Sequence, residues 1–251
     1  MAQPPKGWSE RVFAEERFWI KDSGKVKTLL GWGPTLNRGA SLMRLQRLTA
    51  TTGFPFGALA CAEQVHGSSV AVLSGDVLKG PVHTVGAHDG LMCTTPDRGV
   101  VVWTADCVPV LVEGGGMVSA VHSGWRGTAA GIIPKAIELF ARLHGTMPCD
   151  LSATIGPAIG PCHYPVGSEV ITALDRWAVS DSSWRQGNSI DLRLFLRRQL
   201  LDLGLLDSKV EIVGPCTTCD PGLASFRRDG LAAGRQISII GRTADRLGPV
   251  R

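Results

Sequence analysis

Two short motifs combine residues that bind metals or act as nucleophiles, and each follows a hydrophobic segment. Thr104-Ala-Asp-Cys107 comes after a valine-rich run, and His122-Ser-Gly-Trp-Arg-Gly127 comes after a second apolar run. The segment between them, an apolar stretch at 108–112 followed by three glycines, is typical of strands joined by tight turns. We therefore expect Cys107 and His122 to meet at one edge of a single sheet.

A third candidate, His66, stands in Gln64-Val-His-Gly67, directly before a strand-like segment at 69–74. Two imidazoles and one thiolate suit zinc, and a catalytic zinc commonly has three protein ligands and an exchangeable water. The metal lowers the pKa of that water, which makes it a nucleophile near neutral pH. Asp106 would point away from Cys107 on a strand, so we expect a structural role for it rather than a ligand role.

The same residues allow two other interpretations. In a metal-free enzyme, Cys107 would be the nucleophile and a histidine its base. In a purely structural interpretation, the histidines belong to turns and Cys107 is a small buried thiol. Spacing alone does not decide between these alternatives, because a sequence cannot prove that three distant residues converge.

Cys216-Thr-Thr-Cys219 has a spacing that also occurs in zinc sites, but a structural zinc normally needs a second pair of ligands. Cys162-His163 is the one obvious partner pair, and it lies on a different loop. We therefore expect a turn with two reduced thiols, and neither a disulfide nor a second zinc site.

Two further motifs carry glycines or charge. Gly124, Gly127 and Gly131 surround a predicted strand-to-helix turn, where free backbone N–H groups and Arg126 could bind an anion. The competing interpretation is a tight turn that needs glycine for conformational reasons. For Arg227-Arg228-Asp229 we expect an internal Arg–Asp pair, and the alternative is a contact with substrate or a partner.

Composition limits the function classes. The chain has 251 residues, 44% of them hydrophobic and 19% charged, which allows a sizeable core. The net charge of +4 comes from scattered Lys and Arg residues rather than a basic stripe with aromatic partners, so we expect no nucleic-acid binding. A small anion such as phosphate fits this balance better. We expect neither a signal peptide nor a membrane span. Seven cysteines, an odd number, then suggest reduced thiols in the cytoplasm.

Hydrophobic patterning mixes strands and helices without a regular βαβ rhythm, which favours an α+β fold with mixed β-sheets flanked by helices. We expect a loose lead-in at 1–10 and one domain at 11–251. Asp191 is suited to cap one of the predicted helices. The predicted helices span 128–143, 167–177 and 190–203, and the predicted strands lie within 98–123 and at 152–155, 209–213 and 236–240.

Further motifs occur along the chain in a fixed order, over roughly residues 30–240. They are Gln64-Val-His-Gly67, Asp89-Gly-Leu91, Thr104-Ala-Asp-Cys-Val-Pro-Val-Leu111, Ala120-Val-His-Ser-Gly-Trp-Arg-Gly-Thr-Ala-Ala-Gly131, Ile155-Gly-Pro-Ala-Ile-Gly-Pro-Cys162, Tyr164-Pro-Val-Gly167, Asp191-Leu192, Cys216-Thr217, Ser225-Phe-Arg-Arg-Asp-Gly230 and Gly234-Arg235-Gln236. Together they resemble one family of zinc-dependent purine nucleoside phosphorylases. It is called the laccase-domain family, and its members are also described as polyphenol oxidases or peptidoglycan editing factors.

The resemblance implies a fold, a site and an activity. It implies an α+β domain in which His66, Cys107 and His122 bind zinc, with copper the less favoured metal. It also implies that Asn37 and Arg44 contact the nucleoside, although the longer loop typical of the family is shortened here before Met43-Arg44. Arg126 is our further candidate for holding phosphate or the ribose region.

The implied reaction is phosphorolysis of adenosine, inosine, guanosine or methylthioadenosine to a base and ribose 1-phosphate, with adenosine deamination as a second activity. The partners would be purine nucleosides and phosphate, and we expect a monomer or homodimer. Two alternatives remain open: a Cys–His hydrolase or editing factor acting on peptidoglycan precursors, and a non-catalytic binding protein. A copper polyphenol oxidase fits least, because such oxidases need many histidines in His-X-His pairs and this chain has six histidines and no such pair.

Overall fold

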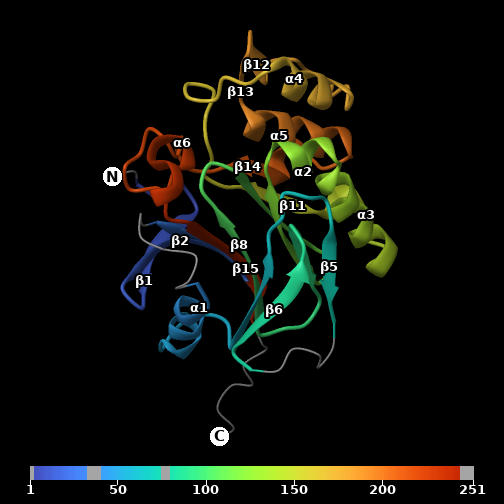
Figure 1. Ribbon diagram of the computed structural model, residues 1–251. Helices are drawn as coiled ribbons and strands as arrows, with labels where there is room; N and C mark the ends of the chain where they lie inside the picture. Colours follow the sequence, from blue (N-terminus) through green and yellow to red (C-terminus); the bar gives the residue numbers. More distant parts are fainter. Residues whose placement is uncertain (1–2, 33–40, 75–79, 244–251) are drawn as a thin grey trace, which may run out of the picture.

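Two β-sheets lie face to face, and helices cover their outer surfaces in a computed structural model of the chain (Figure 1). The structure describes residues 3–32, 41–74 and 80–243. The arrangement is a single domain with mixed sheets and confirms the predicted α+β class. No helix in these described ranges is long and apolar enough to cross a membrane.

The first sheet has seven strands in the order β1-β2-β3-β15-β8-β4-β6, and it includes both parallel and antiparallel pairs. Its strands are β1 (Trp8–Phe13), β2 (Glu16–Ser23), β3 (Val26–Trp32), β4 (Ala58–Glu63), β6 (Val82–Ala87), β8 (Arg98–Thr104) and β15 (Gln236–Arg242). β1 pairs with β2 along its whole length, so residues 8–10 of the expected loose lead-in lie in a strand.

The second sheet has six strands in the order β14-β11-β9-β10-β7-β5. Its strands are β5 (Val70–Leu73), β7 (Gly90–Cys93), β9 (Val108–Gly114), β10 (Met117–Ser123), β11 (Ser152–Ile155) and β14 (Val210–Ile212). A separate two-stranded ribbon is formed by β12 (Arg185–Gln186) and β13 (Ser189–Ile190).

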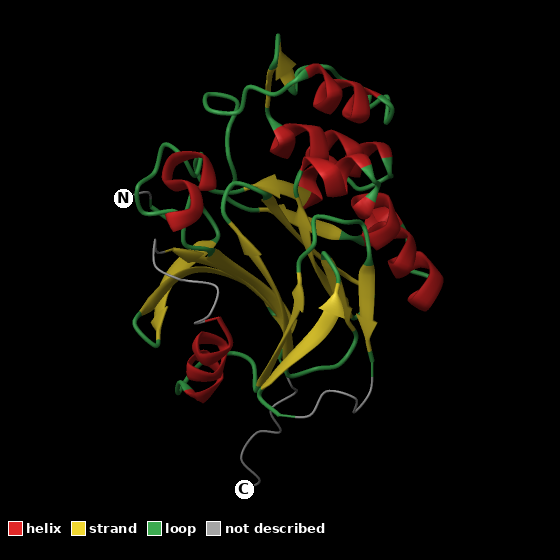
Figure 2. Ribbon diagram, viewed as in Figure 1, coloured by secondary structure: helices red, strands yellow, loops and turns green. Residues whose placement is uncertain are grey.

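Figure 2 shows the helices on the outside of the two sheets. The helices of the described residues are α1 (Ser41–Ala50), α2 (Trp125–Ala129), α3 (Ile132–His144), α4 (Ser168–Asp175), α5 (Leu192–Asp202) and α6 (Phe226–Asp229). Helices α3, α4 and α5 share a core with the outer face of the six-stranded sheet, whereas α1 packs on the outer face of the seven-stranded sheet.

The unbroken valine and isoleucine runs of the central strands follow from this layering. Successive side chains of a strand point to opposite faces, and here both faces are buried. In β8, Val100 and Val102 enter the core between the sheets, whereas Val101 enters the core under α1. In β9, Val110 enters the core under the helices and Leu111 the core between the sheets.

Two local expectations need correction. The predicted helix at 128–143 is divided into α2 and α3, because Gly131 adopts a left-handed backbone with φ of 78° between them. β8 and β9, which we expected to be neighbours in one sheet, belong to different sheets. Cys107 therefore stands where the chain passes from one sheet to the other. Other predictions are confirmed: Asp191 caps α5 by accepting from the N–H groups of Arg193 and Leu194.

Candidate metal centre

His66, Cys107 and His122 converge, as their strand-end positions predicted. Their ligand atoms all lie within 4.8 Å of one another. His122 is at the end of β10 and only 3% exposed, Cys107 is partly exposed between β8 and β9, and His66 is exposed after β4. The two imidazole rings meet edge to face, with centroids 4.8 Å apart.

Asp89 positions both histidines. Its carboxylate accepts the N–H groups of Val65, His66 and Gly67 at 3.3, 2.9 and 2.6 Å, which fixes the loop that carries His66. It also bonds His122 Nδ1 at 2.7 Å. A carboxylate on the outer nitrogen of a ligating histidine sets the tautomer, so that Nε2 is left for the metal. The sequence contained this residue in a recognised motif but gave no indication of its role.

Close backbone approach explains two of the glycines. A Cβ at Gly124 would lie 2.9 Å from Cys107 Sγ, and a Cβ at Gly127 would lie 2.7 Å from the carbonyl oxygen of Gly67. Any larger residue at Gly124 would push on the thiol, and one at Gly127 would push on the loop of His66. Gly124 and Gly127 therefore allow close packing around the candidate ligands. Helix α2, which begins after Gly124 and contains Gly127, has only five residues.

The electrostatics favour a thiolate in the metal-free protein. Burial raises the pKa of the Cys107 thiol, but hydrogen bonds and charge from His122 and His66 outweigh burial and lower it to about 6. Burial lowers the pKa of His122, but Asp89 and Cys107 raise it to about 9. At neutral pH the two side chains therefore form a thiolate–imidazolium pair; the thiolate is a soft metal donor, and His122 must release its proton when a metal binds.

The three residues line a cavity of about 620 Å³. This volume is inside the range of roughly 300–1,000 Å³ typical of small-molecule sites. Trp103, Ile159 and Phe226 give the cavity an apolar part, and Arg227 and Arg235 bring two guanidinium groups to its lining. A ligand with a planar apolar portion and an anionic partner matches this lining.

The other predicted site residues lie in different places. Asn37 falls outside the described residues. Arg44 is buried, forms an ion pair with Glu16 and lies near the Trp103 ring, with Leu42 of the same helix lining the cavity. Arg126 is exposed and stacks on the Trp125 ring, with Cζ 4.4 Å from the ring centroid. Neither Arg44 nor Arg126 is among the residues that line the cavity.

Asp106 is a structural residue, as expected. It has a left-handed backbone, with φ of 84°, and does not join the ligand group. Its carboxylate accepts from Thr217 Oγ1 and from the backbone N–H of Arg227, both at 2.6 Å. Asp106, the residue before Cys107, is therefore bonded both to the loop that follows β14 and to α6.

Sequence reasoning missed Tyr164 and underrated Arg227, although both stood in quoted motifs. Arg228 pairs with Asp229 as expected, but Arg227 lines the cavity and donates to the carbonyl oxygen of His163 at 2.8 Å. Burial and the nearby Cys107 thiolate raise the pKa of Tyr164 to about 12, so its hydroxyl stays protonated. The sole tyrosine of the chain, placed beside a Gly/Pro-rich loop, was the signal available.

A second group of side chains of metal-ligating types lies together in the structure, which the sequence did not lead us to expect. Cys162 and His163 lie beside Cys216 and Cys219, and their ligand atoms are within 4.8 Å of one another. We expected no second zinc site here, because Cys162-His163, the one obvious partner pair, lies on a different loop from Cys216 and Cys219. The parallel bridge between Ala158 and Cys216 brings the two loops together, which the sequence pattern did not reveal.

Comparison with known proteins identifies the family. The family described as multi-copper polyphenol oxidoreductase laccase matches residues 39–243. Purine nucleoside phosphorylase YlmD of Geobacillus stearothermophilus is 34% identical over 212 residues, which cover 78% of this chain and 77% of the relative. Purine nucleoside phosphorylase Rv2149c of Mycobacterium tuberculosis is 35% identical over 201 residues, covering 77% of this chain and 76% of the relative.

Solved structures share the fold. The crystal structure of YlmD from Geobacillus stearothermophilus aligns with a TM-score of 0.81 at 27% identity, over 96% of this chain and 100% of that one. Neisseria meningitidis protein NMB0706 aligns with a TM-score of 0.71 at 25% identity, over 95% of this chain and 100% of that one. The chain belongs to the laccase-like polyphenol oxidoreductase family, as its motifs predicted.

Proposed function

We propose that the protein is a zinc-dependent purine nucleoside phosphorylase. The observation that carries this proposal is the three-ligand group of His66, Cys107 and His122 opening into a cavity that also holds two arginines. The names of the relatives, which are purine nucleoside phosphorylases, support the same reaction. The substrates would be a purine nucleoside and phosphate, and the products a free base and ribose 1-phosphate.

The donor set fits zinc. Two imidazoles and one thiolate give three protein ligands and leave a position open toward the cavity, which is the composition of many catalytic zinc sites. Zinc bound there would supply Lewis-acid polarisation of a substrate group or of water. Copper is the less favoured metal, because a multicopper oxidase needs several histidine-rich sites and the two groups in the described residues contain three histidines in total.

The chain's own residues suit the nucleoside and the anion. Trp103 and Phe226 offer aromatic surface for a purine ring. Tyr164, kept protonated by its raised pKa, can donate a hydrogen bond to the base or the ribose. Arg227, whose backbone N–H is held by Asp106, is placed to neutralise phosphate as it approaches ribose C1′. We expect Arg235 to assist from the same lining.

Asn37, Arg44 and Arg126 remain proposed contacts to the nucleoside or the anion. Phosphate KM values of Arg44→Lys, Arg126→Lys and Arg227→Lys distinguish them, because lysine keeps the charge but loses the paired donors of arginine. We expect Arg227→Lys to raise the phosphate KM most. If Arg44→Lys and Arg126→Lys both match the unaltered protein, neither residue contacts phosphate.

The decisive experiment is product identification. The zinc-loaded protein is incubated with adenosine, inosine, guanosine or methylthioadenosine, with and without phosphate. We expect phosphate-dependent release of the base together with ribose 1-phosphate, and no release by Cys107→Ala. Base release without phosphate, yielding free ribose, would contradict the assignment as a phosphorylase.

Adenosine deamination is the second proposed activity of the same cavity. It consumes water rather than phosphate, so inosine should appear from adenosine in the absence of phosphate. A shared cavity requires that inosine inhibit deamination competitively and that His66→Ala damage both reactions. Loss of deamination in His66→Ala with phosphorolysis intact would show that the two reactions do not depend on one site.

One observation favours a second candidate function. Cys107, His122 and Asp89 form a thiolate, imidazole and carboxylate series, with His122 Nδ1 2.7 Å from Asp89 Oδ1. This series is the arrangement of a Cys–His hydrolase, which could act on amide bonds of peptidoglycan precursors. Such an enzyme would be active after chelation and inhibited by zinc, whereas the phosphorylase would lose activity with its metal. A binding protein without catalysis would turn over neither class of substrate.

A further inference from the structure

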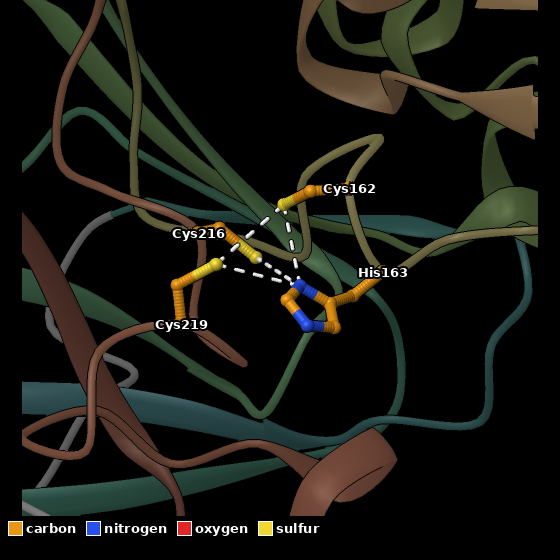
Figure 3. A group of neighbouring side chains, drawn as sticks. All are labelled: Cys162, His163, Cys216 and Cys219. Atoms are coloured by element: carbon orange, nitrogen blue, oxygen red, sulfur yellow. Dashed lines mark hydrogen bonds between the residues drawn. The ribbon is translucent and has the colours of Figure 1, made fainter.

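Four side chains from two loops meet in one compact group (Figure 3). Cys162 and His163 lie in the loop between β11 and α4, and Cys216 and Cys219 lie in the loop between β14 and α6. All four point toward one another in Figure 3. We propose that they form a second zinc site, closed by four protein ligands and structural in role.

The distances between the ligand atoms match the edges of a zinc tetrahedron. Bonds of about 2.3 Å to sulfur and about 2.0–2.1 Å to nitrogen require S–S edges near 3.8 Å and S–N edges near 3.6 Å. Cys162 Sγ and Cys219 Sγ are 3.6 Å apart. His163 Nδ1 lies 3.3, 3.9 and 3.4 Å from the sulfurs of Cys162, Cys216 and Cys219. These four edges lie within about 0.3 Å of the ideal values, and the other two, from Cys216 Sγ to the sulfurs of Cys162 and Cys219, are no longer than 4.8 Å.

The backbone around Cys216 is arranged for a metal-bound thiolate. The N–H of Gly160 donates to Cys216 Sγ at 3.1 Å, and the N–H groups of Thr218 and Cys219 also point to that sulfur. Donors two and three residues after the first cysteine are what a Cys-X-X-Cys turn supplies when it wraps a metal. Cys162 and Cys219 are exposed, so an ion can reach the site from solvent.

Four ligands leave no open position, and the contacts of the two loops indicate what the ion would do. Arg227 Nη1 donates to the carbonyl oxygen of His163 at 2.8 Å, and Thr217 Oγ1 donates to Asp106 at 2.6 Å. Tyr164, in the first loop, and Arg227, in the helix α6 that directly follows the second loop, belong to the cavity lining. The ion would fasten these loops together and thereby fix one wall of the cavity. This inference does not depend on the reaction that the cavity performs.

A disulfide between Cys162 and Cys219 is the competing state. The two sulfurs are 3.6 Å apart, whereas a disulfide requires about 2.05 Å, and all seven cysteines are free in the structure. Oxidation would remove two of the four ligands. Metal binding and this disulfide are therefore mutually exclusive, and the experiment must separate them.

The test measures zinc per chain in protein purified under reducing conditions. The variant Cys107→Ala removes a ligand of the open group, so the zinc that remains reports the four-residue cluster. We expect about one zinc ion per chain in Cys107→Ala and less than about one tenth after Cys216→Ser and Cys219→Ser are added. Cys149→Ser, which alters an exposed cysteine outside both groups, should keep the zinc content of its parent.

A second measurement does not require protein that carries the Cys216→Ser and Cys219→Ser changes. In Cys107→Ala, exchange of zinc for Co²⁺ should give the thiolate charge-transfer and d–d absorption bands of a tetrahedral sulfur-rich site. Zinc should also protect Cys162 and Cys219 from alkylation, and a chelator should remove that protection. Cys107→Ala that holds no zinc and takes up no Co²⁺ would overturn the proposal, as would a Cys162–Cys219 disulfide in protein alkylated at lysis.

Discussion

Two groups of cysteine and histidine side chains differ in the structure that supports them. The first group is His66, Cys107 and His122, and the second is Cys162, His163, Cys216 and Cys219. The three residues of the first group are carried by the ends and connections of long strands from both sheets. The four residues of the second group lie on two loops that are joined by one isolated bridge, between Ala158 and Cys216. The first is open to a cavity, and the second is closed by its own ligands.

This difference relates the number of protein ligands in each group to the elements that hold them, sheets in one case and loops in the other. A group held by sheets does not need a metal to keep its shape, so an open position can be left for chemistry. A group held by loops gains its shape from the metal, and a fourth ligand closes it. The comparison predicts that perturbing the first group changes activity with little change in folding, and that perturbing the second changes the cavity wall and stability.

Cys107→Ala should have the largest effect. The variant loses a ligand whose partners are held by β10 and by the Asp89-bonded loop after β4, so it should fold normally and lose the metal of the open group. We expect catalytic efficiency to fall by about three orders of magnitude or more, because the metal's contribution to the barrier is several kcal/mol. Nucleoside phosphorolysis, zinc content and far-UV circular dichroism check this. Full zinc occupancy of the open group in this variant would remove the basis of the comparison.

Asp89→Asn should have the next largest effect. In either orientation of the new amide, its NH₂ group faces an N–H donor that now bonds to the carboxylate, either in the His66 loop or at His122. Two donors then meet without an acceptor. We expect zinc affinity or activity to fall about 10- to 100-fold. Asp22→Asn is the matched control, since Asp22 also accepts a turn N–H, from Gly24 at 3.0 Å, but lies outside both metal-binding groups. Equal affinity in both variants would show that Asp89 does not position the ligands.

Cys216→Ser combined with Cys219→Ser should have a moderate effect of a different kind. The open group keeps its three ligands, but the loops that carry Tyr164 and Arg227 lose their link. We expect a lower thermal midpoint and a loss of catalytic efficiency of roughly ten-fold from misplacement of the wall. Cys149→Ser serves as the control for loss of a thiol. If the double variant melts and reacts like this control, the second group has no part in holding the cavity wall.

Thiol reactivity gives the smallest and most direct contrast. In protein stripped of metal, Cys107, with a pKa of about 6, is mostly thiolate at pH 7. The larger thiolate fraction is partly offset by lower nucleophilicity, so alkylation should be about four-fold faster than for an ordinary exposed thiol. The rate should rise with pH through a midpoint near 6, because deprotonation creates the reactive form. A midpoint near that of a free thiol would show that the histidines do not stabilise the thiolate, and added zinc should suppress the reaction.

The first group was predictable from sequence and the second was not. Cys107 and His122 each follow an apolar strand and His66 precedes one, so local patterning placed all three at strand ends. A buried valine run has the same sequence pattern in either sheet. The pattern therefore could not show that β8 and β9 belong to different sheets. The second group depends on the pairing of Ala158 with Cys216, a contact between distant irregular segments with no periodic signal. Asp89 escaped notice for a similar reason, since its partners are backbone groups of another loop.

The position of β15 has a consequence for how the chain reaches this structure during synthesis. β15 is formed by residues 236–242, yet it lies inside the seven-stranded sheet, where it pairs with β3 on one side and β8 on the other. Until those residues leave the ribosome, β3 and β8 present unpaired edges, which are the surfaces through which nascent chains aggregate. The strand that leads to Cys107 gains β15 as its neighbour only after residues 236–242 have been translated. We therefore expect the group of His66, Cys107 and His122 to be assembled after that point, and nascent chains to be most exposed to chaperones and proteases before it.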